Sequence, residues 1–212
     1  MLEALTGIGL AASAGLNAWI PLLLIGLLAR FTSLITLPHA WHWMTNGWIL
    51  GILSVLLAIE IVADKVPVLD SVNDVIHTSI RPTSGGIAFG AAADSHTVAV
   101  SDPSQFLSGH EWIAIGSGAL IALFMHLMKS TARPVINTFT LGLGGPVVST
   151  AEDATSLSLS FVAIVIPILV IVFLFVIIFI FWRVRRRIRR RKAAAALARP
   201  PIPPPTLLPP PR

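Results

Sequence analysis

The sequence predicts an all-α protein, a polytopic bundle of transmembrane helices. Of its 212 residues, 55% are hydrophobic and only 12% are charged, whereas an average soluble protein has about 25% charged residues. The mean hydropathy is +0.83. Ten of the fifteen Lys and Arg residues lie at or beyond Arg183, so residues 1–182 carry five basic and ten acidic residues, a balance of −5. We therefore divide the chain into a membrane domain (1–182), a basic juxtamembrane segment (183–199) and a Pro-rich, disordered tail (200–212).

The absence of certain residues and motifs narrows the function. The sequence contains no cysteine, which excludes disulfides, thiolate metal sites and thiol chemistry. No nucleophile elbow, P-loop, dinucleotide fingerprint or His-Glu-x-x-His motif is present. We predict no cofactor, leave metal binding open, and find no support for an enzyme.

The first apolar segment covers residues 4–29, about 26 residues where roughly 20 suffice to cross the hydrocarbon of a bilayer. No basic region precedes it, so we interpret it as an uncleaved first span. Asn17 and Pro21 lie in its middle. They indicate either an interhelical hydrogen bond with a tolerated kink, or a broken helix that lines a cavity.

A second, short span is predicted at 48–63, with Glu60 in its last turn. Apolar and polar residues then alternate at helical spacing through residue 82. Residues 85–93 are small and apolar but too few to cross alone. Either residues 66–93 form one polar-faced span, or this segment is re-entrant, which requires protein or water around its backbone.

Residues 112–128 are predicted to form another span, whereas residues 130–150 are rich in Thr, Asn, Gly and Pro and favour a broken or re-entrant segment. The last span, 156–182, would extend roughly 40 Å at about 1.5 Å per residue. It must therefore tilt, kink at Pro167 or protrude. Four spans with two short, broken or re-entrant segments, or six spans, both agree with this pattern.

The basic segment begins directly after the last span. Its charged residues are Arg183, Arg185, Arg186, Arg187, Arg189, Arg190, Arg191 and Lys192. The positive-inside rule places them in the cytoplasm, and an even number of crossings of the cytoplasmic membrane would place the N-terminus there too. We expect these side chains to bind anionic lipid headgroups and not nucleic acid.

A candidate internal repeat links residues 48–93 with residues 112–150. A shift of 64 residues aligns Lys65 with Lys129, Asn73 with Asn137 and Pro82 with Pro146. If the segment after Lys65 is re-entrant, the repeat is inverted, as in many transporters; if that segment spans, the repeat is parallel. The first copy is acidic and the second basic, so the two could face each other as oppositely charged walls.

Carboxylates recur at helical spacing near the second span. Glu60 and Asp64 lie four residues apart, as do Asp70 and Asp74, so each pair shares a helix face. Two interpretations stay open: a pathway for a cation or proton, or a structural network in which these groups pair with nearby Lys and Arg. Ser149 and Glu152 match a capping box, although Asp153 beside them leaves ion binding open.

These residues support a resemblance to a known family. The chain resembles the DUF4126 family of bacterial integral membrane proteins, whose function is unknown. The matching segments are Ala14-Gly-Leu-Asn-Ala-Trp-Ile-Pro-Leu-Leu, Glu60-x3-Asp64-Lys65-x-Pro67-x2-Asp70 with Arg81-Pro82, His126-x2-Lys129-x3-Arg133, and Ser149-x2-Glu152-Asp153. They cover about residues 5–165, so the basic and Pro-rich tail lies outside the resemblance, which implies site residues without assigning a reaction.

We predict a small transporter or channel for an ion or solute, built around a central polar site. It is expected to form a homo-oligomer, because so few spans enclose little volume. The alternatives are a non-catalytic accessory or assembly protein, whose tail binds lipid or a partner, and an intramembrane enzyme acting on a lipid-linked substrate. The predicted polar site comprises Asn17, Pro21, Glu60, Asp64, Lys65, Asp70, Asp74, His77, Arg81, His126, Lys129, Arg133, Asn137, Ser149, Glu152 and Asp153.

Overall fold

A computed structural model describes residues 1–65, 67–93, 95–100, 111–140 and 144–197, with the backbone alone at 67–72, 133–140, 181, 184, 188 and 191–197. The elements are α1 (Leu2–Leu16), α2 (Trp19–Phe31), β1 (Ile35–Thr36), the 3-10 helix η1 (His39–Thr45), α3 (Gly47–Ala63), α4 (Pro67–Ala93), β2 (His96–Thr97), α5 (Glu111–Thr140), α6 (Gly144–Val165) and α7 (Ile168–Leu197). The predicted all-α bundle is confirmed. The chain forms two compact units, residues 1–176 and residues 177–212.

Asn17 divides the first apolar segment into two helices. Its backbone is extended, with φ −140° and ψ 123°, and its amide still donates to the Ser13 carbonyl at 3.0 Å. Its side-chain oxygen accepts hydrogen bonds from the amides of Trp19 and Ile20 at 3.1 and 3.3 Å, which an N-terminal cap does for a new helix. Pro21 lies in the first turn of α2, where a missing N–H costs nothing.

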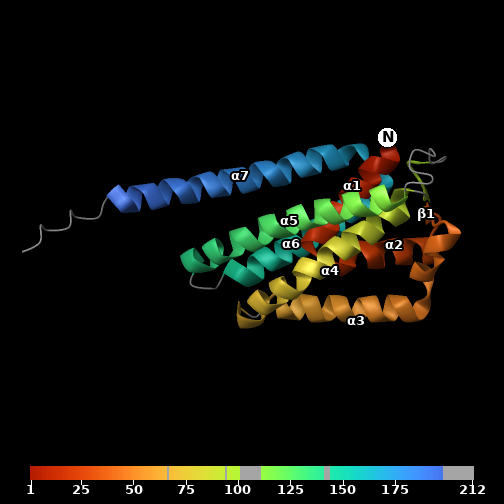
Figure 1. Cartoon of the computed structure of the whole chain (residues 1–212), viewed down its shortest axis with the longest axis horizontal. Helices are drawn as coiled ribbons and strands as arrows, with labels where there is room; N and C mark the ends of the chain where they lie inside the picture. Colours follow the sequence, from red (N-terminus) through yellow and green to blue (C-terminus); the bar gives the residue numbers. More distant parts are fainter. Residues whose placement is uncertain (66, 94, 101–110, 141–143, 198–212) are drawn as a thin grey trace, which may run out of the picture. The chain divides into compact units, whose positions relative to one another are not determined.

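The two helices form a hairpin that turns back on itself (Figure 1). Gly7 lies against Phe89, the Ser84 hydroxyl donates to the Ala18 carbonyl, and Ile35 pairs with Thr97 in the β1–β2 ladder. α1 therefore runs along α4 from Phe89 toward Ser84, and α2 runs back to the end of the bundle where α1 begins. The predicted single crossing by residues 4–29 is wrong, because the helix is broken at Asn17. Asn17 also makes an interhelical hydrogen bond, to Asp153 of α6, and the cavity that a broken helix was expected to line stays a prediction.

Residues 67–93 form one continuous helix, α4, so the re-entrant alternative for this segment is wrong. It follows α3, whose start is capped by Asn46: the Asn46 side-chain oxygen accepts from the Trp48 amide at 2.9 Å. Pro82 lies inside α4 and has no N–H to donate to the Thr78 carbonyl. The helix continues through it because α4 packs along both α1 and α5.

Two further predictions concern breaks. The segment 130–150 is divided between two helices, because α5 continues to Thr140 and α6 begins at Gly144. Of the two predicted forms, broken or re-entrant, the described backbone agrees with the broken one. The predicted span 156–182 is divided instead, because α6 ends at Val165 and α7 begins at Ile168. Proline cannot continue a helical ladder, and a Cβ placed on Gly9 would lie 2.6 Å from Ala163 and 2.8 Å from Val170. Both sides of the Pro167 break therefore pack on α1.

Two described helices are long and apolar enough to cross a membrane: residues 111–132 of α5 and residues 168–187 of α7. A third is counted if η1 and α3, which meet at 60°, act as one span. The predicted spans at 48–63 and 112–128 correspond to α3 and to the first part of α5. α1 and α2 are apolar but shorter.

Small residues allow the helices of the first unit to pack with their backbones almost in contact. α1, α4, α5 and α6 lie side by side there (Figure 1). A Cβ on Gly15 of α1 would lie 2.5 Å from the Ala122 carbonyl of α5, and one on Gly118 would meet the Gly85 carbonyl of α4. Such close approach is how helices associate in lipid, where hydrophobicity gives no preference for protein over solvent.

α3 and α5 run in the same direction, and α4 and α6 both run in the opposite one. α3 begins beside Arg30 and ends at Asp64, while α5 runs from Ile115, beside Gly90, to Lys129, beside Asp64. α4 and α6 then both return. The internal repeat stays a prediction, and these directions agree with its parallel form.

Candidate functional site

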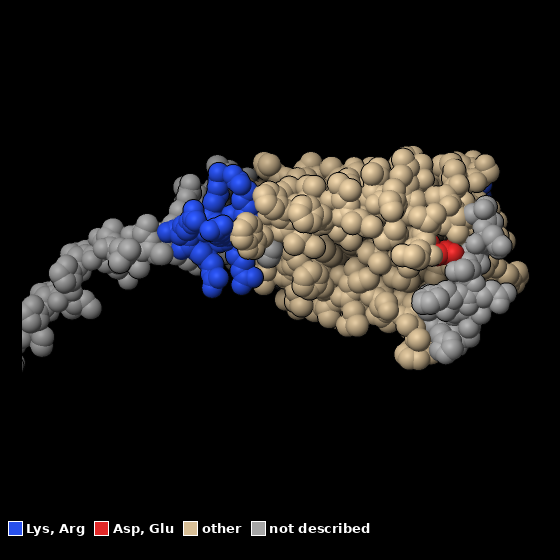
Figure 2. Space-filling view, turned by 90° about the horizontal axis from the view of Figure 1, so that it is seen from above, with Lys and Arg blue, Asp and Glu red and all other residues tan. Residues whose placement is uncertain are grey.

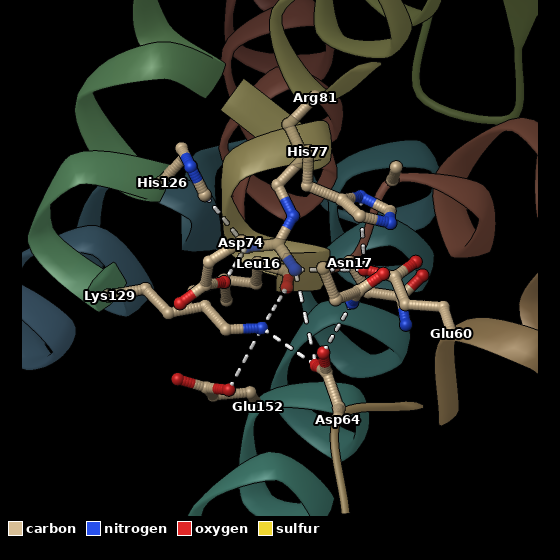
Figure 3. Close-up of polar contacts among 12 residues, drawn as sticks. Leu16, Asn17, Glu60, Asp64, Asp74, His77, Arg81, His126, Lys129 and Glu152 are labelled. Carbon is tan, nitrogen blue, oxygen red and sulfur yellow. Dashed lines mark hydrogen bonds and ion pairs between the residues drawn. The ribbon is translucent and has the colours of Figure 1, made fainter. Parts of the chain in front are cut away.

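Charged residues from four helices gather at the level of the Asn17 break (Figure 3). α3 supplies its last turn, α4 its first half, α5 its middle and α6 its first half. We call this cluster the charged centre. It comprises Asn17, Glu60, Asp64, Lys65, Asp74, His77, Arg81, His126, Lys129, Glu152 and Asp153.

Arg81 lies at the middle of the charged centre and is 0% exposed. Its Nη2 donates to Glu60 Oε1 at 2.8 Å, and its Nη1 donates to His126 Nδ1 at 2.9 Å. Because a guanidinium has no acceptor, His126 receives this bond as a neutral ring with its hydrogen on Nε2. That nitrogen lies 3.1 Å from the Thr78 hydroxyl, which itself donates to the Asp74 carbonyl.

Lys129 uses all three of its protons inside the protein. Its Nζ lies 3.0 Å from Asp64 Oδ2, 3.1 Å from Glu152 Oε2 and 3.1 Å from the Leu16 carbonyl oxygen. The last four carbonyls of a helix have no partner within it, and the C-terminal end of a helix favours a cation. The break after Leu16 therefore creates one ligand of Lys129.

Asp64 connects the two buried cations. Its Oδ1 accepts from Asn73 Nδ2 at 2.7 Å and its Oδ2 from Lys129. The same Oδ2 lies 4.0 Å from Arg81 Nη2. Buried charges persist only when they are paired and hydrogen-bonded, and Asp64 meets this condition through partners on α4 and α5.

The edge of the charged centre is more open. Asn17 Nδ2 donates to Asp153 Oδ1 at 2.9 Å, and Lys65 Nζ lies 4.0 Å from Asp153 Oδ2. The Lys65 side chain is 38% exposed. This edge lies between the buried ion pairs and the surface, at Lys65 and at Asp153 in the first half of α6.

Four buried polar atoms of the charged centre have no hydrogen-bond partner among the described residues: Glu60 Oε2, Asp74 Oδ1, His77 Nδ1 and Arg81 Nε. His77 Nδ1 lies 3.5 Å from Glu60 Oε1, outside good hydrogen-bond range. The edge of its ring packs on Trp19, with ring centroids 6.3 Å apart. In this fully packed region each such atom calls for a water, a proton or a ligand.

The remaining predicted site residues lie elsewhere or outside the description. The side chains of Asp70, Arg133 and Asn137 are outside the described residues, although their backbones lie in α4 and α5. Pro21 is buried in the first turn of α2. The Ser149–Glu152 capping box is wrong, because α6 begins at Gly144 and Glu152 pairs with Lys129. Ser149 is instead buried inside α6, and its hydroxyl has no hydrogen-bond partner in the described part of the chain.

The sequence-based prediction missed several groups that lie in or beside the charged centre. Asn73 and Thr78 lie on the polar face of α4, so their helical spacing from His77 and Arg81 could have identified them. The Leu16 carbonyl could not have been found, because it becomes a ligand only where α1 ends. Ser13 was also missed: its hydroxyl lies 2.7 Å from that of Ser156 and 2.5 Å from that of Ser160, next to the charged centre.

The second unit carries the basic residues of α7, which gather at one end of this helix (Figure 2). The side chains of Arg183, Arg185, Arg186, Arg187, Arg189 and Arg190 are exposed, and those of Arg191 and Lys192 lie outside the description. Arg186 stacks on Trp182, with its guanidinium 5.1 Å from the ring centroid. A tryptophan followed by arginines is typical of the membrane–water boundary.

An open groove of about 300 Å³ runs between α2 and α4 next to the charged centre, where its Trp19 contacts the His77 ring. It is lined by Trp19, Leu22, Ser79, Ile80, Thr83, Ser84 and Ile87. Across the described residues, no three His, Asp or Glu side chains are placed to hold a metal ion together. The site therefore offers ion pairs and unpartnered polar atoms rather than a preformed metal cage.

Comparison with known proteins gives one match. The model of DUF4126, described as a domain of unknown function, matches residues 4–187. No curated protein and no solved structure matches the chain.

Proposed function

The chain belongs to the DUF4126 family, a domain of unknown function, and we propose that it is a small membrane transporter or channel that handles an ion or polar solute at the charged centre. The proposal rests on the geometry of the site, since the family itself carries no reaction. Two or three helices are apolar enough to cross a membrane.

The observation that carries the proposal is the helix break at the level of the buried charges. The end of α1 directs the Leu16 carbonyl at Lys129, and the start of α2 is capped by Asn17, which also holds Asp153. Discontinuous helices whose ends meet charged groups in the middle of the bundle form the substrate and ion sites of many transporters.

The cost of the buried charges supports a functional role. Four of them, Glu60, Asp64, Arg81 and Lys129, have side chains at most 1% exposed. Replacing a buried ion pair with apolar residues is often neutral or stabilising, so stability alone gives little reason to keep two such pairs. Ionisable residues at membrane depth usually belong to substrate, ion or proton pathways.

The helix directions also bear on topology in the cytoplasmic membrane. α3, α4, α5 and α6 alternate in direction, which returns the chain at Pro167 to Gly9 of α1. We propose that residues 168–187, which are long and apolar enough to cross a membrane, add one further crossing, so that the number of crossings is odd. With the basic segment in the cytoplasm, we place the N-terminus outside, instead of in the cytoplasm as an even number of crossings implies.

A single-cysteine experiment tests this topology. The chain has no cysteine of its own, so a cysteine introduced as Leu2→Cys is the only thiol. We expect a membrane-impermeant maleimide to label it in intact cells, and a cysteine at Ala193→Cys to react only after permeabilisation. Labelling of both positions only after permeabilisation would show that both termini are cytoplasmic.

Flux in liposomes tests the transport function. Asp64→Asn and Lys129→Ala remove opposite members of one buried ion pair and should each lower ion or solute flux at least tenfold. Glu111→Gln and Arg30→Ala serve as matched controls, because both side chains are exposed and outside the charged centre. Equal flux in all four variants and the unmodified protein would refute the proposal.

A second candidate function is a non-catalytic accessory protein with a structural charge network. The complete use of the Lys129 protons favours it. In this case the exposed arginines of α7 would bind anionic lipid or a partner. Replacing Arg183, Arg185, Arg186 and Arg187 by Gln should then abolish binding to vesicles that contain anionic lipid, whereas a transporter would keep its flux.

A further inference from the structure

We propose that the charged centre takes up a proton and that Glu60 and His77 together hold it. This inference rests on the proposed transport function and names its substrate. Glu60 Oε1 and His77 Nδ1 lie 3.5 Å apart, and both side chains are at least 95% buried. Each can bind a proton, and the two face each other across a contact that is too long for a good hydrogen bond.

Glu60 and His77 each have a buried atom that is available to bind a proton. Glu60 Oε2 and His77 Nδ1 have no hydrogen-bond partner among the residues the structure describes. Protonation of His77 at Nδ1 turns this nitrogen into a charged donor toward Glu60. Protonation of Glu60 at Oε2 instead leaves Oε1 free to keep its bond from Arg81. In both cases one proton is added and no other bond changes.

The other titratable groups of the charged centre are already engaged. Both oxygens of Asp64 accept hydrogen bonds, from Asn73 and Lys129, and both nitrogens of His126 have partners. Lys129 from α5 also binds Glu152 from α6.

The two acidic residues that remain lie at the edge. The side chain of Asp74 is 15% exposed and lies 4.0 Å from Arg81, and that of Asp153 is 17% exposed beside Lys65. Asp74 Oδ1 is also buried without a hydrogen-bond partner among the described residues, but the group nearest to it in these contacts is the Arg81 guanidinium, which cannot accept a proton. Glu60 and His77 instead lie 3.5 Å from each other, so a proton on one can be shared with the other.

The pair has an access route on one side. Trp19 contacts the His77 ring and also forms part of the wall of the α2–α4 groove, which is open to the outside. A change in the Trp19 side chain would connect His77 with this groove. On the other side, the exposed Lys65–Asp153 edge connects the centre with the surface. The proposal therefore has a proton reach Glu60 and His77 past Trp19 or from the Lys65–Asp153 edge.

Proton flux measures this directly. Purified protein is placed in liposomes that contain a pH-sensitive dye, and a potassium diffusion potential drives protons inward. Glu60→Gln keeps an oxygen for Arg81 but cannot exchange a proton, and it should lower proton flux at least tenfold. His77→Gln should do the same. The matched controls Glu111→Gln and His39→Gln change exposed residues and should leave the flux unchanged.

Further outcomes decide between the proposals. Glu60→Asp keeps a carboxylate and should retain measurable proton flux, which a merely structural role for the bond to Arg81 does not predict. If Glu60→Gln folds poorly, as seen in its melting temperature, His77→Gln decides alone. Flux of sodium or potassium that is independent of Glu60 and His77 would overturn the proton inference and leave transport intact. The absence of any flux in the unmodified protein would overturn both.

Discussion

The two halves of α4 hold the bundle together in different ways. Before Pro82 the helix carries Asp74, His77 and Arg81. His77 and Arg81 meet Glu60 of α3, and Arg81 also meets His126 of α5 and lies 4.0 Å from Asp74. After Pro82 it carries Gly85 and further small residues against α1 and α5. The first half is held to its neighbours by buried ion pairs. The second half is held by close contact between helix backbones, which its small side chains allow.

This difference predicts opposite sensitivities to substitution. In the first half a change of charge should be severe, because a buried charge without its partner is strongly unfavourable. In the second half the addition of a single methyl group should lower stability, because a well-packed interior cannot accommodate extra atoms without strain. A change of size in the first half and of polarity in the second should matter less.

The largest effect is expected for Arg81→Leu. It removes the cation from Glu60 and the donor from His126, and breaking a buried ion pair costs about 3–5 kcal/mol. Thermal unfolding in detergent should show a large drop in melting temperature. Arg30→Leu is the control, because this exposed arginine donates only to the Thr45 carbonyl in the described contacts. Similar drops in the two variants would contradict the electrostatic account of the first half.

Gly85→Ala tests the second half of α4. The added Cβ would meet Ala122 Cβ and lie 2.8 Å from the Gly118 carbonyl oxygen, so we expect a loss of about 1–3 kcal/mol from overpacking. Gly116→Ala lies on the facing helix α5 and has no atom within 4 Å of its new Cβ. Its melting temperature should stay near that of the unmodified protein. An unchanged melting temperature for Gly85→Ala would show that α4 and α5 can move apart without a loss of stability.

A double-mutant cycle compares the buried and exposed ion pairs. For Asp64→Asn with Lys129→Met, which lie 3.0 Å apart, we expect a coupling of about 1–3 kcal/mol. For Asp153→Asn with Lys65→Met, at 4.0 Å and with Lys65 partly exposed, the coupling should fall to about 0–1 kcal/mol. Equal coupling energies would mean that burial does not make the Asp64–Lys129 ion pair stronger than the Asp153–Lys65 ion pair.

The smallest effect is expected for Ser13→Ala, which removes a neutral group next to the charged centre. Its hydroxyl bonds to Ser156 and Ser160, and the loss of a neutral hydrogen bond costs about 1 kcal/mol. Ser54→Ala, whose exposed hydroxyl donates only within α3 among the described contacts, should be close to neutral. A loss as large as that of Arg81→Leu would place Ser13 within the charged network.

The sequence by itself determined the fold class and the residues that stand out in it. Long apolar runs require helices in a bilayer, so α3 and the first part of α5 could be located from composition alone. Charged residues are rare in such runs, and Glu60, Asp64, Lys129 and Glu152 were conspicuous for this reason. The role of these residues stays a prediction, although their proximity is now described.

Only the tertiary structure decided where the chain reverses. Asn17 and Pro167 both interrupt a helix, and a local interruption is compatible with a kink or with a turn. The choice depends on distant partners: Ser84 holds the Ala18 carbonyl, and Val170 packs on Gly9. The reversal at Asn17 exposes the Leu16 carbonyl to Lys129, so a ligand of the charged centre arises from packing between segments more than 100 residues apart in sequence. No local pattern carries that information, because helix ends acquire their partners only when the other helices are in place.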